Sequence, residues 1–224
     1  MTISDQQRLK IAVAQAAVRE VVDGSILGVG TGSTVDCFID ELAKAGKPLA
    51  AAISSSKRST ERLQALGYTI MGLHELTAPM DLYIDGADEI DPHLCMIKGG
   101  GAALTQEKIV ASAAKRFICI VDASKRVPVL GRFPLPIEVI ESAIVPVGWA
   151  IRAMGGDPRR RPGVMTDNGH PILDVHGLSI TDPVAMETAF NQIPGIVTNG
   201  IFALRRADLA LVASTDGVSR LTQN

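Results

Sequence analysis

The sequence is poor in aromatic residues and has no excess of either charge. Only 4% of its 224 residues are Phe, Trp or Tyr, and 22 basic against 24 acidic residues leave a net charge of −2. Few rings are therefore available to stack on bases, and no overall field attracts nucleic-acid phosphates or an anionic membrane. We expect neither a nucleic acid nor a membrane as partner.

Cysteines are few, and long apolar runs are absent. Cys37, Cys95 and Cys119 are widely spaced and form no CxxC pair, which suits a reducing compartment better than a disulfide-stapled fold. No apolar run approaches the roughly 20 residues that span a bilayer, and the first 15 residues lack the pattern of a secretory signal. With 46% apolar residues, the sequence predicts a soluble, cytoplasmic α/β protein.

Helical and strand patterns alternate over the first 130 residues. A capping box formed by Ser4 and Gln7 opens a predicted helix that ends near Val22. A second helix has Val35, Phe38, Ile39 and Leu42 at helical spacing, and further helices are predicted over 60–66 and 104–115. Short apolar strands are predicted at 26–30, 49–53, 81–85 and 116–121. This alternation is typical of βαβ units around a parallel sheet.

Three prolines between 128 and 136 mark a change of pattern. Beyond them we predict a strand at 137–140, a helix with Trp149 in the core, a hairpin turning at Asn168-Gly169, and a helix from Pro183 to about 193. Arg159–Arg161 is placed in a loop, too short a run for a nucleic-acid surface. We assign residues 1–130 and 205–224 to one domain and 131–204 to a smaller α+β domain, with 209–212 returning to the first sheet.

The first of four polar loops runs from Gly28 to Thr34. Its backbone N–H groups and hydroxyls precede a predicted helix, an arrangement that favours an anion site. Ser33 occupies the third glycine position of the dinucleotide fingerprint, and the lysine of a P-loop is missing. The spacing alone fits a phosphate site and a simple tight turn equally well.

The second loop, from Asp85 to Asp91, has four carboxylates within seven residues. General acid–base chemistry, a hard metal ion and a solvated acidic turn are all compatible with it, although the calcium-loop spacing is absent. The four histidines are scattered without ligand spacing, so we expect no metal site. Asp85 and Asp88 lie nearest the strand end and are the better candidates.

The third and fourth loops each contain a lysine. Lys98 is followed by Gly99, Gly100 and Gly101, where a substrate can approach the bare backbone. Glu107 comes soon after, and it either complements the dipole at the start of a helix or takes part in catalysis. Lys125 follows the strand at 116–121 and has the features of an ordinary solvated lysine. Because ligands bind at the carboxyl ends of parallel strands, the four loops are expected to converge.

The amino-acid sequence resembles that of one enzyme family over essentially the whole chain, these loops included. The segments that carry the resemblance are, in order, GVGTGST, SSSKRST, YIDGADEID, MIKGGGAALTQEK, VDASK, GRFPLPIEVI, TDNG, ILDVHG, IPGIVTNGIF and ADLALV. They are similar to type A ribose-5-phosphate isomerase. The resemblance implies a Rossmann-like domain with a smaller α+β domain, no cofactor and a homodimer. Gln106 is a departure, since many relatives have Arg there.

Residue roles follow from this resemblance, position by position. It implies that Glu107 is the proton acceptor, that Asp85 and Asp88 open the sugar ring and move protons, and that Lys98 stabilises an enediolate. The implied substrate-binding residues are Thr31, Gly32, Ser33, Thr34, Asp85, Gly86, Ala87, Asp88, Lys98, Gly99, Gly100, Gly101, Lys125 and, in the first helix, Lys10. The implied reaction interconverts ribose 5-phosphate and ribulose 5-phosphate through a cis-enediol.

Two other classes of function are weighed against this one. A non-catalytic sugar-phosphate sensor, like the effector domains of some repressors, would leave Glu107 and Lys98 without a purpose. An NADP-dependent oxidoreductase would use the first glycine loop with Lys57 and Arg58, but the missing third glycine opposes it.

Overall fold

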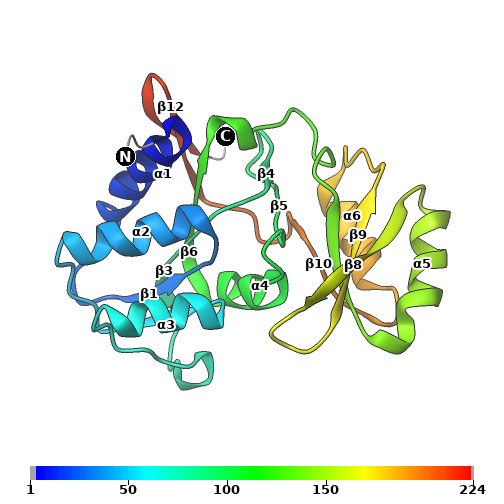
Figure 1. Ribbon diagram of the computed structural model, residues 1–224, viewed down its shortest axis with the longest axis horizontal. Coiled ribbons are helices and arrows are strands. Elements are labelled where there is room, and N and C mark those ends of the chain that lie inside the picture. Colours follow the sequence, from blue (N-terminus) through cyan, green and yellow to red (C-terminus); the bar gives the residue numbers. More distant parts are fainter. Residues whose placement is uncertain (1–3, 223–224) are drawn as a thin grey trace. The chain divides into compact units, whose positions relative to one another are not determined.

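The computed structural model describes residues 4–222, which form two compact units (Figure 1). Of the described residues, unit 1 comprises 4–86, 109–125 and 207–222, and unit 2 comprises Ala87–Lys108 and Arg126–Arg206. The predicted fold class, a Rossmann-like parallel sheet domain with a second α+β domain, is confirmed.

Unit 1 is built on a six-stranded sheet in the order β13-β12-β6-β3-β1-β2. Its strands are β1 (Ile26–Val29), β2 (Ala51–Ser54), β3 (Met80–Asp85), β6 (Ala114–Asp122), β12 (Leu209–Ser214) and β13 (Gly217–Thr222). All neighbours pair in parallel except β12 and β13, which form an antiparallel hairpin. The five parallel strands follow the doubly wound order 2-1-3-4-5, whose topological switch point lies between β1 and β3. The predicted return of 209–212 to this sheet is confirmed.

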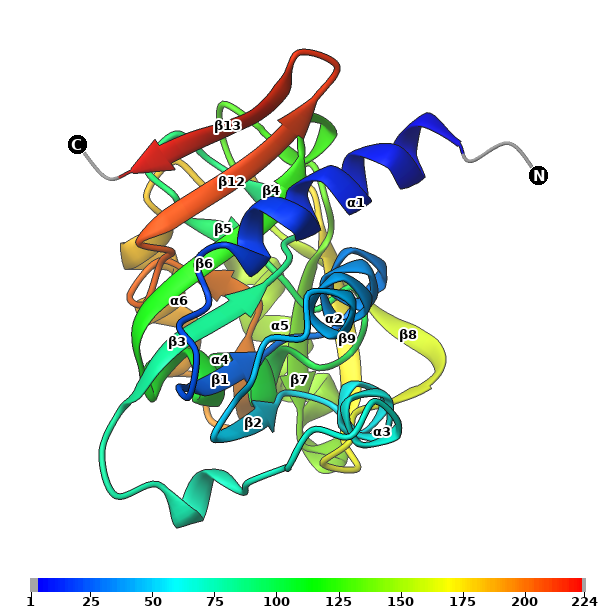
Figure 2. The ribbon, with the colours of Figure 1, turned by 90° about the vertical axis from the view of Figure 1, so that its left-hand side faces the viewer.

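Three helices of unit 1 lie on one face of this sheet, as Figure 2 shows. They are α1 (Asp5–Val18), α2 (Ser33–Lys44) and α3 (Lys57–Ala65), and a short 3-10 turn, η1 (Leu73–Glu75), precedes β3. The predicted cap is present, since the Gln7 N–H donates to Ser4 Oγ at 3.2 Å. The apolar face predicted for α2 is buried in the core with Leu27 and Val29 of β1.

Unit 2 contains two antiparallel sheets. The larger has the order β10-β7-β9-β8, and the smaller has the order β11-β5-β4. The strands are β4 (Glu89–Ile90), β5 (Met96–Ile97), β7 (Leu135–Val139), β8 (Asp157–Met165), β9 (Pro171–His176), β10 (Ile196–Asn199) and β11 (Ile201–Phe202). The helices are α5 (Ile144–Ala153), which follows the turn η3 (Glu141–Ala143), and α6 (Pro183–Asn191). The predicted β8–β9 hairpin and the predicted start of α6 at Asp182-Pro183 are confirmed.

Helix α4 (Leu104–Ser112) contributes to both units, with Leu104–Lys108 in unit 2 and the remainder in unit 1. Residues 87–108 pack with unit 2 because β5 pairs with β11, and β4 pairs with β5, in the smaller sheet. The sequence-based division at residues 130 and 205 places residues 87–108 in the first domain. This division into domains stays a prediction.

Two local expectations were wrong. Trp149 is 67% exposed, because Val147 and Ile151 form the buried face of α5 and Trp149 lies about 200° around the helix from Val147. Arg159–Arg161 is part of strand β8 and not of a loop. As the edge strand of its sheet, β8 tolerates the neighbouring prolines Pro158 and Pro162.

Within residues 4–222, no helix combines the length and the apolar character that crossing a membrane requires.

Candidate active site

The first polar loop of unit 1 lies at the carboxyl edge of the parallel sheet and is fixed from two sides. The Thr31 N–H donates to Asp85 Oδ1 at 3.1 Å, at the end of β3. The Thr31 hydroxyl accepts a hydrogen bond of 3.0 Å from Ser56 Oγ, beyond the end of β2. In unit 1, therefore, the segments that follow β1, β2 and β3 meet at one place.

Asp85 is the buried centre of this arrangement. It is fully buried and accepts hydrogen bonds from the N–H groups of Thr31 and Gly86 and from the Tyr83 hydroxyl. A Cβ at position 30 would lie 1.9 Å from Asp85 Cγ, so only glycine permits this close approach of the loop to the carboxylate. The Asp85 carboxylate is thereby held in one orientation.

The start of α2 has the properties of an anion site. Gly32 and Ser33 are exposed and Thr34 is half-buried at the helix N-terminus, where backbone N–H groups are free of helical partners. Lys10 Nζ, on α1, donates to Ser33 Oγ at 2.9 Å. A cation, two hydroxyls and a helix N-terminus are thus close together in unit 1.

Lys125 also follows a strand of this sheet. It ends the 3-10 turn η2 (Ala123–Lys125), directly after β6, and is half-buried. Asp122 fixes this turn by accepting hydrogen bonds from the Ser124 N–H and hydroxyl. Lys125 therefore comes after the carboxyl end of a strand in the same parallel sheet as the loop that contains Thr31.

In unit 2, Lys98 and Glu107 form a buried ion pair. Lys98 Nζ lies 3.3 Å from Glu107 Oε2, and the two side chains are only 3% and 5% exposed. Glu107 is in the first turn of α4, yet its burial beside a lysine is not the environment of an acid that merely complements a helix dipole in solvent. Lys98 follows β5, which belongs to the small antiparallel sheet and not to the parallel one.

Asp88 and the glycine segment 99–101 are bonded to each other in unit 2. Asp88 Oδ2 accepts a hydrogen bond of 2.8 Å from the Gly100 N–H, and the Asp88 N–H donates to the Ile97 carbonyl. A Cβ at position 100 would lie 2.7 Å from Asp88 Oδ1, so a larger residue there would displace the Asp88 carboxylate. Asp88 and the segment after Lys98 are therefore held together.

The acidic segment is not a solvated turn. Glu89 and Asp91 are buried, as is Asp85. Glu89 accepts the N–H groups of Gly131 and Phe133, and Asp91 accepts those of His93 and Cys95. Glu89 and Asp91 bind backbone donors of 131–133 and 93–95, whereas Asp85 and Asp88 bind backbone donors at Thr31, Gly86 and Gly100.

Comparison with known proteins decides the family. Residues 51–217 match the family model "Ribose 5-phosphate isomerase A (phosphoriboisomerase A)". Ribose-5-phosphate isomerase A of Leptothrix cholodnii is 59% identical over 217 residues, which cover 96% of this chain and 98% of that protein. This chain belongs to the ribose 5-phosphate isomerase A family. The family resemblance and the enzyme class expected from it, an aldose–ketose isomerase, are confirmed.

Solved structures of the ribose 5-phosphate isomerase A family share the whole fold. The crystal structure from Neisseria gonorrhoeae is 44% identical with a TM-score of 0.97, and the match covers 100% of both chains. A D-ribose-5-phosphate isomerase in complex with phospho-erythronic acid is 36% identical with a TM-score of 0.93, over 98% of this chain and 100% of that one.

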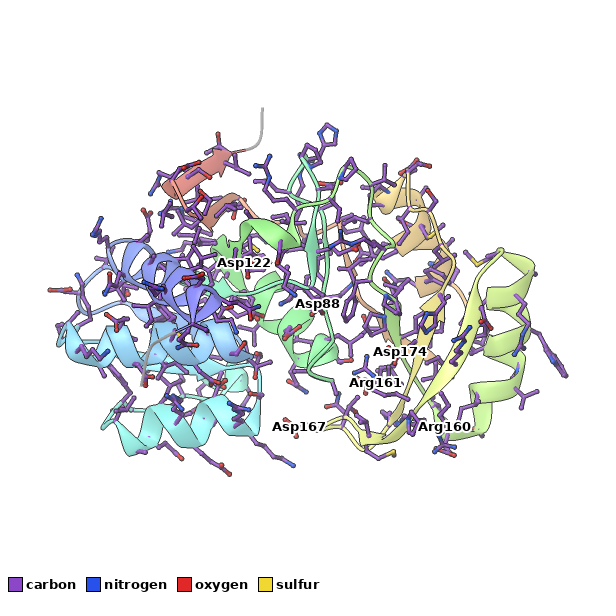
Figure 3. All side chains as sticks on the ribbon, turned by 45° about the horizontal axis from the view of Figure 1, so that its top comes forward. Asp88, Asp122, Arg160, Arg161, Asp167 and Asp174 are labelled. Carbon is purple, nitrogen blue, oxygen red and sulfur yellow. The ribbon has the colours of Figure 1, made fainter. Side chains whose placement is uncertain are left out.

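An arginine that sequence reasoning missed contacts the glycine segment of this chain. Arg161 donates to both Asp174 carboxylate oxygens, and its Nη1 reaches the carbonyls of Gly99 and Gly100 at 3.1 and 3.2 Å. Figure 3 labels Arg161 and Asp174 on the neighbouring strands β8 and β9. No local signal marks this role, because Arg161 lies about 60 residues from the glycines along the chain.

Phe202 is a second residue that sequence reasoning missed. Its ring centroid lies 5.5 Å from Lys98 Nζ and 4.7 Å from Lys108 Nζ, so one ring faces two cations. Lys108 also donates to Glu187 and to the Ile201 carbonyl, and burial lowers the pKa of its ammonium group. Lys108, the residue after Glu107 on α4, therefore connects this helix to β11 and α6.

Within residues 4–222, no group of three or more His, Cys, Asp or Glu side chains is arranged to hold a metal ion.

Proposed function

We propose that this chain interconverts D-ribose 5-phosphate and D-ribulose 5-phosphate in the non-oxidative pentose phosphate pathway, with Glu107 as the proton-transferring base. The observation that carries the proposal is the buried Lys98–Glu107 pair in a member of this family. The reaction moves one proton between C2 and C1, so it needs a base at carbon and a cation for the developing oxyanion. Glu107 and Lys98 supply these two groups.

Glu107 takes the proton from C2 of the open-chain aldose and delivers it to C1 of the cis-enediol. During this step negative charge develops on the carbonyl oxygen, and the Lys98 ammonium stabilises it. Low exposure strengthens this interaction, because Coulomb attraction grows as water is excluded. No electron leaves the sugar, so the reaction as proposed uses no cofactor.

Asp85 and Asp88 open the ring and move protons between sugar oxygens. Support comes from their fixed orientations, since each carboxylate accepts backbone N–H hydrogen bonds that hold it in place. The backbone of Gly86, Ala87 and Gly99–Gly101 contacts the sugar hydroxyls, because the glycines let the substrate approach closely.

The phosphate binds at the start of α2. Thr31, Gly32, Ser33 and Thr34 offer N–H and hydroxyl donors, and Lys10 and Lys125 offer positive charge. Binding energy from the phosphate anchors the substrate at a distance from the reacting carbons. We also propose that the enzyme acts in the cytoplasm as a homodimer, with a pentose phosphate as its small-molecule substrate and neither nucleic acid nor membrane as partner.

The test is an isomerisation assay on the purified chain without added metal or cofactor. We expect conversion of ribose 5-phosphate to ribulose 5-phosphate, unchanged after exhaustive chelation, and competitive inhibition by phospho-erythronic acid. Lys125→Ala should mainly raise KM. Absence of turnover with intact sugar-phosphate binding would favour a sensor, and a loss of activity that metal restores would contradict the proposed chemistry.

A further inference from the structure

A fully buried carboxylate in unit 2 has no part in the mechanism above. Glu138, on β7, is 0% exposed. It accepts hydrogen bonds from the Thr105 hydroxyl, from Thr166 Oγ1 at 3.0 Å and from Asn168 Nδ2 at 3.1 Å. Three donors from two segments distant in sequence therefore converge on one buried acid.

Two residues of this hydrogen-bond network, Thr105 and Gln106, immediately precede the proposed base Glu107 in the sequence. Thr105 lies in the first turn of α4, and Gln106 Nε2 donates to Asn168 Oδ1 at 2.8 Å. The turn at Thr166–Gly169, which the sequence marks only as a hairpin, thus reaches the helix that carries Glu107. Glu138 binds this helix directly through Thr105 and indirectly through Asn168 and Gln106.

The partners of Glu138 distinguish it from the other buried acids of unit 2. Glu89 and Asp91 accept backbone N–H groups, as does Glu187 through one oxygen, and so stabilise their loops. The described hydrogen bonds to Glu138 all come from side chains. Hydrogen bonds inside a protein are electrostatically stronger than in water, so this buried network holds its side-chain donors in place.

The position of Thr105 on the helix gives this network its effect. Successive residues of an α-helix are rotated by about 100°, so Thr105 and Glu107 project from nearly opposite sides of the first turn. A bond that holds Thr105 therefore fixes the rotation of the turn about the helix axis. That rotation sets the direction of the Glu107 carboxylate.

We propose that Thr105 and Glu138 are positioning residues that hold Glu107 in place for proton transfer. The inference rests on the proposed function of Glu107 as the base. A base displaced by about 1 Å loses on the order of 100-fold in rate without a matching loss in substrate binding. Disrupting the network should therefore change kcat and leave KM nearly unchanged.

The first test replaces the Thr105 hydroxyl by a methyl group of similar size. Thr105→Val should lower kcat for ribose 5-phosphate by about 10- to 100-fold, with KM within about twofold of wild type. Thr105→Ser keeps the hydroxyl and should restore most of kcat. The matched control is Thr188→Val on α6, an exposed threonine whose hydroxyl donates to the Val184 carbonyl of its own helix, and kcat should not change.

A second test asks whether Thr105 acts through the base. In a Glu107→Gln background, adding Thr105→Val should cause no further loss of kcat, because nothing remains to be positioned. A further loss equal to that seen in wild type would overturn the inference.

Other outcomes separate this inference from the proposed function. If wild type is inactive, or if Glu107→Gln keeps wild-type kcat, the base assignment fails whatever Thr105→Val does. If wild type is active and Glu107→Gln is not, a Thr105→Val variant with unchanged kcat overturns the positioning role alone. If circular dichroism shows that Thr105→Val does not fold, Asn168→Ala is the alternative variant. Asn168 is exposed, and its replacement removes the indirect connection from Glu138 to Gln106. An unchanged kcat in Asn168→Ala also overturns the inference.

Discussion

Arg161 provides the sharpest prediction about what stabilises the glycine segment. Its guanidinium binds Asp174 with both oxygens engaged, at 2.5 and 2.8 Å, and donates to the carbonyls of Gly99 and Gly100. Arg161→Ala removes all of these bonds at once. The remaining Asp174 carboxylate and two carbonyls are then left without their donors.

The expected cost follows from burial. The side chains of Arg161 and Asp174 are 14% and 21% exposed, so the pair is closer to the buried limit than to the surface limit. Breaking a buried pair costs about 3–5 kcal/mol, whereas an exposed pair contributes about 0–1 kcal/mol. For a pair about one fifth exposed, we expect Arg161→Ala to lower the free energy of unfolding by about 2–4 kcal/mol.

The neighbouring arginine is a matched control. Arg160 also binds a carboxylate with two bonds, to Glu141 at 2.9 and 3.0 Å, but these side chains are 51% and 59% exposed. Arg160→Ala should therefore cost less than about 1 kcal/mol.

Urea unfolding of wild type and both variants measures the difference. With a urea slope of about 2 kcal/mol per M, the Arg161→Ala midpoint should fall by about 1–2 M. KM for ribose 5-phosphate should also rise in Arg161→Ala, because Gly99 and Gly100 lose their anchor. Equal destabilisation by the two variants would refute the reasoning from burial.

Two other predictions follow from pKa shifts. Hydrogen bonds and charge from Arg220 and Arg116 hold the pKa of Glu20 below its usual 4.5. These interactions therefore stabilise the folded protein fully above pH 4.5. Their contribution is lost as the pH falls through the lower pKa that Glu20 has in the folded protein. Acid unfolding of Glu20→Gln should show a shallower loss of stability below about pH 5, and an unchanged profile would argue against the pairing. Burial raises the pKa of the Cys95 thiol to about 11, and Cys37 and Cys119 are buried thiols as well, so dithiobis(nitrobenzoate) at pH 8 should label the three cysteines only after unfolding. Rapid labelling of the native protein would contradict this.

Much of the fold was predictable because its signals are local. The spacing of Val35, Phe38, Ile39 and Leu42 predicts α2, and Asn168-Gly169 predicts the β8–β9 turn. Trp149 could not be placed correctly, since which face of α5 is buried depends on packing that a short helix pattern does not specify.

The loops of the candidate site were predictable from glycines, acids and lysines beside strand ends. The residues that hold those loops were not, because their partners are far away in sequence. Arg161 binds glycines 61 and 62 residues away, and Glu138 binds Thr105 at a separation of 33. Such pairings exist only once the sheets of unit 2 have formed, and a charged residue in a strand gives no local sign of them.

The most direct test of Glu107 as the base is hydrogen exchange at carbon in deuterated water, followed by NMR of the sugar phosphates. Wild type should incorporate deuterium at C2 of ribose 5-phosphate and C1 of ribulose 5-phosphate during turnover. Glu107→Gln should bind phospho-erythronic acid as wild type does but exchange at least about 1,000-fold more slowly. Exchange at a rate near wild type in that variant would contradict the account.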